Sequence, residues 1–298
     1  MRYIVRLKKA AFVLCVILIP FVVGGCWLSA ENSEGAMFGA DLARTGVFPS
    51  GGPSTFNRLV WKFQTGDSVI SSPTISENTV YIGSAAAMTD NGHLHAVNTE
   101  TGEERWSFQT DDGIGSSPAV SGGMVYFGSG DKHLYALDAK TGEEQWAFRT
   151  DGGVGSSPAV SGGMVYFGSV DKHLYALDAK TGEEQWAFRT SRGIVSSPAI
   201  SGGSVYVGSF DYYFYSVDAK TGKEIWSFRT DKTVSSSPAV SGETVYFGSW
   251  DQHFYAAGTA TGHVQPSFRA EGVIDSSPAI SDGTVYFAST GGYLYAVE

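Results

Sequence analysis

Short runs of apolar residues alternate with polar turns along most of this chain, and the pattern recurs. Its most regular stretch, Asp111–Thr150, contains four such runs, at Ser116–Val120, Met124–Gly128, His133–Leu137 and Gln145–Arg149. The runs are rich in β-branched and aromatic residues and are separated by Gly, Ser and Asp, which is typical of strands joined by tight turns. No segment shows helical spacing with caps, so we expect almost no helix.

The stretch is followed at once by a near copy, residues 151–190. The two copies differ only at the pairs Asp112/Gly152, Ile114/Val154 and Gly130/Val170. Weaker copies flank them, and the tripeptide Ser-Ser-Pro begins at Ser71, Ser116, Ser156, Ser196, Ser236 and Ser276. A fixed period of about 40 residues indicates a repeat architecture.

Four antiparallel strands in one repeat are the pattern of a β-propeller blade. A single unit of this size buries too little surface to fold alone, whereas neighbouring units can bury each other. A solenoid or a string of separate domains would be the alternatives. We therefore predict an all-β, six-bladed β-propeller of four-stranded antiparallel blades.

The sixth unit has three of the four runs, the last of them Tyr293–Val297. The missing run has a match near the other end, where Leu59–Thr65 reads LVWKFQT, like WSFQT and WAFRT in the fourth runs. We expect this N-terminal strand to close the last blade and so to join the two ends of the propeller.

The turn between the third and fourth runs is the sharpest local signal. Asp138–Gly142 has the sequence of a type I turn followed by a left-handed Gly. The Asp138 carboxylate can accept hydrogen bonds from backbone N–H groups inside such a turn.

Residues 1–25 are predicted to be a lipoprotein-type signal peptide. A basic start precedes the apolar run Ala10–Val23, which is short for a membrane span and typical of a signal core. The segment ends in Val-Gly-Gly-Cys26, which resembles a bacterial lipobox, and we expect lipidation at Cys26; an ordinary secretory signal is the alternative. Residues 26–54 would then be a tether and lead-in, and residues 55–298 the propeller.

The cysteines and the residue after Cys26 bear on the compartment. Cys15 would leave with the signal peptide and Cys26 would be modified, so we expect no disulfide. Trp27 stands where an Asp would favour retention at the inner membrane. We therefore expect an exported cell-envelope lipoprotein on the periplasmic face of the outer membrane or at the cell surface.

Net charge limits the partners. The chain has 20 basic and 30 acidic residues, and removal of four basic residues with the signal leaves 16 against 30, a net charge of −14. Such an acidic chain is not expected to bind nucleic acid or anionic lipid through general electrostatics. Membrane contact should come from the lipid anchor alone.

One motif resembles a known family. The run Ala136-x-Asp138-x-x-Thr141-Gly142-x-x-x-Trp146 is similar to the tryptophan-docking motif of the pyrroloquinoline-quinone (PQQ) propeller superfamily, and the lead-in FGADLARTG is also similar to the start of these propellers. The resemblance implies that one Trp per blade packs on the next blade. The residues in question are Trp61, Trp106, Trp146, Trp186 and Trp226. The fifth unit has Pro266 at this position.

The superfamily contains quinoprotein dehydrogenases and non-catalytic lipoproteins of the BamB type, the outer-membrane protein assembly factor. The resemblance implies that a dehydrogenase would need PQQ, a Ca²⁺ site, an Asp base and a pair of adjacent cysteines. The cysteine pair is absent and the family's enzymes are longer, so we expect no PQQ, no calcium and no catalysis. A degenerate PQQ-dependent dehydrogenase remains an alternative.

Other candidate chemistry has simpler explanations. His93, His133, His173 and His253 share one repeat position, but copies on neighbouring blades should lie about 15 Å apart, too far to share a metal ion. Aspartates such as Asp131 are expected to cap turns. The serine pairs have no His–Asp partner beside them in sequence, so we predict no catalytic residues and no metal site.

Four aromatic residues are the candidate partner surface. Phe210, Tyr212, Tyr213 and Trp250 fall in loops that should share one face of blades four and five, and exposed aromatic residues are enriched at interfaces. Packing between loops is the alternative explanation. We therefore expect a monomeric, non-catalytic scaffold for envelope proteins; a small-molecule or glycan-binding propeller is the alternative.

Overall fold

The computed structural model describes residues 58–85 and 91–298. The predicted signal peptide, Cys26 and the tether of residues 26–54 lie outside these residues. The described residues form strands and turns without a helix, and therefore include no helix of the length and hydropathy of a membrane span. This agrees with the expectation of an all-β chain.

Twenty-three strands form six antiparallel sheets, in the order of the chain. The first sheet is β1 (Thr74–Ser76), β2 (Thr79–Ala85), β3 (Gly92–Asn98) and β4 (Glu104–Thr110). The second is β5 (Ala119–Ser121), β6 (Met124–Gly128), β7 (His133–Asp138) and β8 (Glu144–Arg149). The third is β9 (Ala159–Ser161), β10 (Met164–Gly168), β11 (His173–Asp178) and β12 (Glu184–Arg189).

The remaining sheets follow the same plan with two departures. The fourth is β13 (Ala199–Ser201), β14 (Ser204–Gly208), β15 (Tyr213–Asp218) and β16 (Glu224–Arg229). The fifth is β17 (Ala239–Ser241), β18 (Thr244–Gly248), β19 (His253–Gly258) and β20 (Phe268–Arg269). The sixth has three strands, β21 (Ala279–Ser281), β22 (Thr284–Ala288) and β23 (Leu294–Val297).

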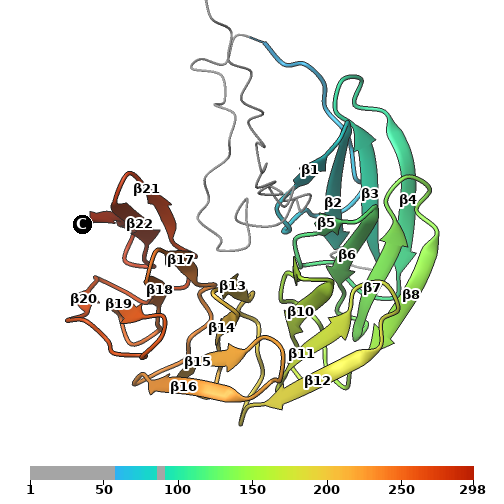
Figure 1. Cartoon of the computed structure of the whole chain (residues 1–298). Coiled ribbons are helices and arrows are strands. Elements are labelled where there is room, and N and C mark those ends of the chain that lie inside the picture. The colour runs from blue at the N-terminus through green and yellow to red at the C-terminus, as the bar shows by residue number, and fades with distance from the viewer. Residues whose placement is uncertain (1–57, 86–90) are drawn as a thin grey trace, which may run out of the picture. The chain divides into compact units, whose positions relative to one another are not determined.

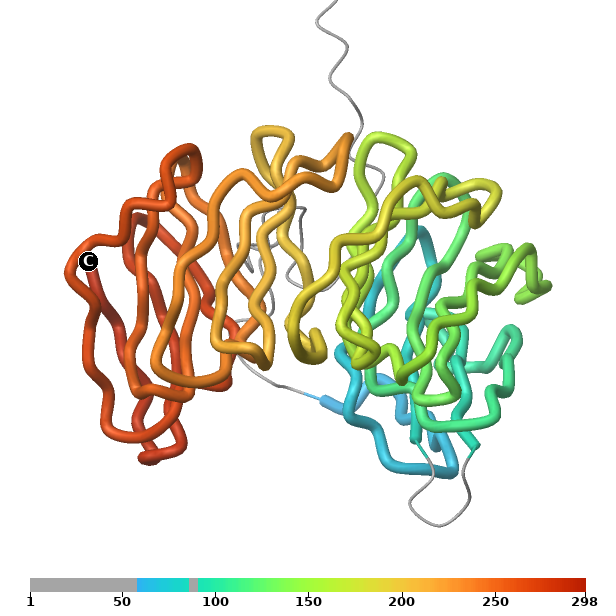
Figure 2. The backbone as a smooth tube through the Cα atoms, turned by 90° about the horizontal axis from the view of Figure 1, so that it is seen from below, coloured from blue at the N-terminus to red at the C-terminus, as the bar shows by residue number. Residues whose placement is uncertain are grey.

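These repeated four-stranded sheets confirm the blade pattern of a β-propeller. Each sheet lies beside the next one in the chain, as the blue-to-red colouring of Figure 1 shows, and the first strands of consecutive sheets are in contact. In Figure 2 the chain runs back and forth between two layers of loops. The hairpin register is constant: Tyr126 faces Ala136 on β6–β7, as Tyr166 faces Ala176 on β10–β11.

The first strand of each sheet begins later than predicted. The sequence predicts a strand over Ser116–Val120, whereas β5 starts at Ala119. Proline has no N–H to contribute to a ladder, so Pro118 ends the bend and the strand begins after it. The two serines before it therefore lie outside the strand, and their side chains are free to bond backbone groups.

The turn between the third and fourth strands has the predicted form. Asp138 Oδ1 accepts hydrogen bonds from the Lys140 and Thr141 N–H groups at 2.9 and 2.8 Å, and Gly142 has φ +74°. These hydrogen bonds, the one from Thr141 first, lower the pKa of Asp138. A β-bulge at Ala136/Leu137 follows in the pairing of β7 with β8.

Adjacent sheets pack through two faces, which we name by their position along the chain. The leading face of a sheet points to the next sheet and includes Tyr126, Leu134 and Trp146 in the second sheet. The trailing face points back and includes Phe127 and Tyr135. Phe108, on the leading face of the first sheet, meets Phe127 and Tyr135 with ring centroids 6.1 and 5.3 Å apart. The cores thus lie mainly between the sheets.

The fifth sheet shows the effect of one proline. Pro266 stands where the first four sheets have a Trp, and β20 is reduced to two residues, with an isolated bridge between Ala257 and Val264. Without an N–H, Pro266 cannot continue the ladder, although an edge strand tolerates it.

The predicted closure is not observed. Residues 58–65 form no regular strand, and no described hydrogen bond joins Leu59–Thr65 to the sixth sheet. Six sheets are present, but the pairing of the N-terminal segment with the last one stays a prediction.

Candidate functional site

One layer of loops is formed by the turn after the second strand of a sheet together with the loop that enters that sheet. We call it the variable face; in the second sheet it consists of residues 111–115 and 129–132. One backbone hydrogen bond recurs at every junction, for example Gly130 N–H to Gly113 O at 3.0 Å and Phe210 N–H to Gly193 O at 3.0 Å. The two loops are therefore held together in each copy.

A buried Asp–Tyr pair fixes this layer. In the second sheet Asp131 accepts hydrogen bonds from Tyr135 Oη (2.8 Å), from the His133 N–H (3.0 Å) and from the Asp111 N–H of the entering loop (3.2 Å). The side chain of Asp131 is only 6% exposed. Burial and the neighbouring carboxylate raise the pKa of Tyr135. The carboxylate is therefore a structural hub, beyond the turn cap that the sequence predicts.

The same hub recurs in three further sheets. Tyr175, Tyr215 and Tyr255 donate to Asp171, Asp211 and Asp251 at 2.8–2.9 Å. The turn residue after each Asp is left-handed, with φ from +74° to +81° at Lys132, Lys172, Tyr212 and Gln252. Because a side chain is disfavoured there, the hub must hold this conformation, together with a Thr hydroxyl that bonds the turn carbonyl in the second to fourth sheets.

Above this constant framework the side chains differ from copy to copy. At each junction one residue of the entering loop lies beside the residue that follows the repeated Ser of the turn. The pairs are Asp112 with Gly130, Gly152 with Val170, Arg192 with Phe210, Lys232 with Trp250 and Gly272 with Thr290.

The pairing also explains two of the three differences between the near-identical copies. A Cβ on Gly130 would lie 2.7 Å from the Asp112 carboxyl, so the larger side chain is accommodated by a Gly opposite. In the next copy the sizes are reversed, with Gly152 against Val170. The junctions before the fourth and fifth sheets carry two large side chains each.

The predicted aromatic residues lie on this face. Trp250 is 40% exposed, and Phe210, Tyr212 and Tyr213 are half-buried. The Arg192 guanidinium lies 5.3 Å from the Tyr212 ring centroid, a cation–π contact. The structure thus places three of the four on adjacent loops; Tyr213 stacks on Tyr215 at 5.7 Å and so is partly a packing residue.

Trp250 is oriented by a polar contact. Its indole N–H donates to Asp275 Oδ1 at 3.0 Å, and Ser235 donates to the same oxygen. The ring is therefore held in one orientation with a large apolar surface in solvent, which suits a preorganised contact residue.

The predicted docking tryptophans share one geometry. Trp106, Trp146 and Trp186 donate their indole N–H to the carbonyls of Ala139, Ala179 and Ala219 at 3.0–3.2 Å. Trp226 donates to Thr259 at 2.9 Å. Each ring covers a left-handed Gly of the next sheet, such as Gly222 under Trp186, where a Cβ would lie 2.7 Å from the ring.

Trp61 makes the same contacts with the first sheet. Its indole N–H donates to Thr99 O at 2.8 Å, and its ring covers Gly102. Phe63 meets His95 with centroids 5.3 Å apart, as Phe108 meets Tyr135. Residues 61–63 therefore occupy the position of a preceding blade's fourth strand, although they are not paired with another strand.

The serine pairs bond backbone groups and each other. Ser116 Oγ donates to Gly128 O at 2.8 Å and accepts from Gly128 N–H at 2.7 Å. The second serines form a relay between sheets, in which Ser72 N–H donates to Ser117 Oγ and Ser117 N–H to Ser157 Oγ, both at 2.9 Å. These contacts give the serines a structural role.

The repeated histidines do not converge. His133 and His173 lie 3.2 Å from the aspartate of their own turn. Within residues 58–85 and 91–298 no three His, Cys, Asp or Glu side chains are grouped to hold a metal ion.

His95 is a feature that sequence reasoning missed. It stands where the other five sheets have a Tyr; it is buried, and its Nδ1 lies 2.7 Å from Glu104 Oε1. The signal was present in the sequence, because aligning the repeats shows His95 opposite Tyr135. The Asp–Tyr hubs were missed for a different reason, since their partners are joined only in the folded blade.

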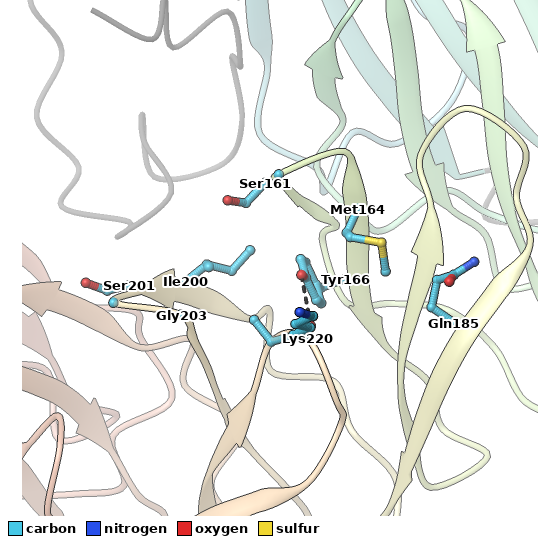
Figure 3. Close-up of a pocket in the computed structure, with 11 residues that line it drawn as sticks. Ser161, Met164, Tyr166, Gln185, Ile200, Ser201, Gly203 and Lys220 are labelled. Atoms are coloured by element: carbon cyan, nitrogen blue, oxygen red, sulfur yellow. Dashed lines mark hydrogen bonds between the residues drawn. The ribbon is translucent and has the colours of Figure 1, made fainter. Parts of the chain in front are cut away.

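A pocket of about 640 Å³ lies on the opposite layer of loops, between the third and fourth sheets. Figure 3 shows Met164, Tyr166 and Ile200 in its wall and Gln185 and Lys220 at its side. Tyr166 donates to the Ala219 carbonyl at 3.2 Å. The corresponding residues between the second and third sheets are nearly the same, so the wall belongs to the repeat and not to one specialised site.

Solved structures share this fold at low sequence identity. A computationally designed protein, Ika8, matches with a TM-score of 0.71, 17% identity, and 80% of this chain and 73% of that chain covered. BamB from Moraxella catarrhalis matches with 0.53, 18%, and 80% and 85% covered. Quinohemoprotein alcohol dehydrogenase from Comamonas testosteroni matches with 0.69, 17%, and 88% and 51% covered, so that the match spans about half of that enzyme.

At 17–18% sequence identity, the similarity to these solved structures shows a shared fold and nothing further. No curated protein matches the chain. The family model described as outer membrane protein assembly factor BamB matches residues 56–113, 90–208 and 189–298, which together span the repeats. The PQQ-like repeats and the resemblance noted in the sequence are thereby confirmed, and the chain belongs to this BamB-like family of PQQ-type repeat proteins.

Proposed function

We propose that the protein is a non-catalytic scaffold of the cell envelope, anchored through a lipid on Cys26, that binds partner proteins through the variable face of the fourth and fifth sheets. The observation that carries the proposal is where the copies diverge. Strands, turns, hubs and docking tryptophans repeat, whereas the side-chain pairs on this face change at every junction. Positions that packing does not fix are the ones free to acquire a specific contact.

Family membership supports the assignment without deciding it, because fold does not fix activity. Both BamB and quinoprotein dehydrogenases share the fold. The chemistry favours the scaffold, since the serines are engaged with backbone groups and the Asp hubs are buried under tyrosines. An exposed, oriented Trp beside aromatic and cationic side chains is the composition of an interface hot spot.

The experiment is crosslinking in intact envelopes, followed by identification of the captured proteins in wild type and in a Phe210→Ala/Trp250→Ala variant. We expect the variant to fold and to lose its main crosslinked partner. Ile225→Ala is the matched control, because Ile225 is 46% exposed on an outer strand away from this face. An unchanged partner profile in the double variant would refute this binding surface.

We also propose that residues 59–65 supply the fourth strand of the last blade. The seating of Trp61 and Phe63 on the first sheet supports it, since both side chains already make the contacts of a fourth strand.

Binding of a small molecule in the pocket at Lys220 is the second candidate function. The volume of the pocket favours this candidate. Its lining residues recur between the second and third sheets, which argues against a site specialised for one ligand. Titration with PQQ and Ca²⁺ in a dye-reduction assay tests the dehydrogenase alternative, and we expect no turnover.

A further inference from the structure

The pocket between the third and fourth sheets has an apolar wall, formed by Met164, Tyr166 and Ile200, which we call its floor. Tyr166 and Ile200 are 4% and 7% exposed, and Met164 packs half-buried on the same core. The Tyr166 hydroxyl already donates to the Ala219 carbonyl, so the floor offers carbon and sulfur atoms and no free donor. Methionine adapts its shape to the group that lies against it. The floor therefore suits a flexible apolar group.

A cation without a partner lies at the side of this floor. It is Lys220, which Figure 3 shows beside Tyr166. Every ion pair among the described residues involves a histidine, so no described carboxylate lies within 4.0 Å of the Lys220 ammonium group. The acid of the same turn, Asp218, accepts hydrogen bonds from the Thr221 N–H and hydroxyl at 2.8 and 2.7 Å. The charge of Lys220 is therefore free to bind a ligand.

Neutral polar groups complete the rim of the pocket. Ser161, Ser201 and Gln185 line it, and the turn glycines Gly202 and Gly203 leave open space where other residues would carry a side chain. One ammonium group beside hydroxyl and amide groups matches the single charge of a carboxylate. Phosphate is typically bound by arginine or by a helix N-terminus, and neither lines this pocket.

The same set of residues recurs one junction earlier, between the second and third sheets. Position by position the residues are those of the pocket, except for a Val in place of the Ile, and Met124 and Lys180 stand where the pocket has Met164 and Lys220. The geometry recurs too, since the ring centroids of the floor tyrosine and the docking tryptophan lie 5.9 Å apart there and 5.8 Å apart in the pocket. The recurrence argues against one dedicated site and predicts two equal ones.

The flanking junctions lack this combination. Between the first and second sheets the buried Thr79 replaces the Met, and Arg105 replaces the Gln and donates to a backbone carbonyl at 3.1 Å. Between the fourth and fifth sheets Ser204 and Ala260 replace the Met and the Lys, and Glu243 adds a negative charge to the turn. Among the described sheets, Met and Lys therefore occur together at two neighbouring junctions only.

We propose that these two junctions are equal binding sites for aliphatic carboxylates. The chain lies on the Met and Tyr side chains of the floor, and the carboxylate binds Lys180 at one site and Lys220 at the other. The inference rests on the second candidate function, small-molecule binding in this pocket, and names its ligand class; it does not depend on partner binding at the variable face. A single ammonium group selects the charge of the ligand, and an adaptable floor accepts chains of different length.

The test uses the full chain in detergent with ¹³C in the methionine methyl groups, so that Met124 and Met164 report on the two sites separately. Met124→Leu and Met164→Leu assign the two signals. We expect sodium hexanoate to shift both signals with similar affinity, and each added methylene to tighten binding by about fourfold. Acetate has the head group without the chain and hexylammonium has the chain with the opposite charge, so neither should shift the signals.

Two lysine variants separate the sites. Lys220→Gln should weaken binding at Met164 by roughly tenfold or more and leave Met124 unchanged, because it removes one ammonium group only. Lys180→Gln should do the reverse, and in each variant the unaffected site shows that the protein is folded. Lys140→Gln is the matched control, since Lys140 has the same place in the turn of the second sheet but faces a junction without a Met, and it should change neither signal.

The outcomes distinguish this inference from the functions on which it bears. Equal shifts with hexylammonium, or a Met164 response that survives Lys220→Gln, would overturn the choice of carboxylates and keep a small-molecule site. A response at only one of the two methionines would overturn the pair of equal sites. No response of either signal to any of the three probes would refute both this inference and small-molecule binding in the pocket, whereas partner binding is decided by the crosslinking profile alone.

Discussion

The third and the sixth sheets have similar sequences in the three strands that they share, but they differ in how well those strands are buried. β10 reads MVYFG and β22 reads TVYFA. Yet Tyr166 is buried and Tyr286 is exposed, and the difference lies in the neighbour, since the third sheet is covered on both faces and the sixth on one. A blade of this kind is as stable as its contacts with the adjacent blades, as in other repeat proteins.

The hub differs between the same two sheets. Asp171 receives Tyr175, whereas Gly291 stands at that position in the sixth sheet, where a Cβ would clash with the Glu271 carbonyl. There the Glu271 N–H donates directly to Tyr295 Oη at 2.9 Å. The entering loop of the sixth sheet thus occupies the space that the carboxylate takes in the third sheet, and it bonds the tyrosine directly.

Replacing an interior docking Trp should produce the largest effect. Trp186→Ala removes a nearly buried ring and an indole hydrogen bond and leaves a cavity over Gly222, for an expected loss of about 4 kcal/mol in the free energy of unfolding. Trp61→Ala should cost less, because no paired strand lies behind it. Urea denaturation of both variants makes the comparison, and equal losses would contradict the difference between seated and paired segments.

Removing a hub carboxylate should come next. Asp171→Ala leaves Tyr175 Oη and two backbone N–H groups without their acceptor, and we expect a loss of about 3 kcal/mol. Asp178→Ala, in an exposed turn, is the matched control and should cost clearly less. A loss of the same size in both would show that Asp171 is an ordinary turn residue.

Alkaline pH should weaken the hubs. Burial and the adjacent Asp raise the pKa of Tyr135, Tyr175, Tyr215 and Tyr255, so the neutral phenol is favoured in the fold. The contribution is complete below the tyrosine pKa of the unfolded chain, about 10, and is lost as pH rises toward the folded value. The urea midpoint of wild type should be lower at pH 11 than at pH 8, and the decrease should be smaller in Tyr175→Phe. An equal midpoint at both pH values would argue against the buried Asp–Tyr pairs.

The smallest effect is a gain. Ser216 Oγ is buried without a hydrogen-bond partner, and the other five sheets have Ala at this position. Ser216→Ala should raise the free energy of unfolding by about 1 kcal/mol by removing an unsatisfied polar group. Ala176→Ser is the reciprocal variant and should destabilise the third sheet, so thermal unfolding of the pair tests the same physics in both directions.

The sequence predicted the features that are local and repeated. Period, turn chemistry and strand composition are written within 40 residues, so the four strands and the Asp138 turn were accessible. Tertiary contacts were harder to predict. The contact of Trp186 with the next sheet was expected only from the family resemblance, and the Asp131–Tyr135 hydrogen bond becomes visible only in the folded hairpin. The pairing partner of Leu59–Thr65 could not be predicted, because the similarity of this segment to a fourth strand does not say which sheet it joins.

Native-state hydrogen exchange, read sheet by sheet, tests the central claim that burial by a neighbour sets the stability of each blade. We expect the amides of β10 and β11 to exchange only by global unfolding and those of β22 and β23 to exchange much faster by local opening. Uniform protection of all six sheets would contradict the account.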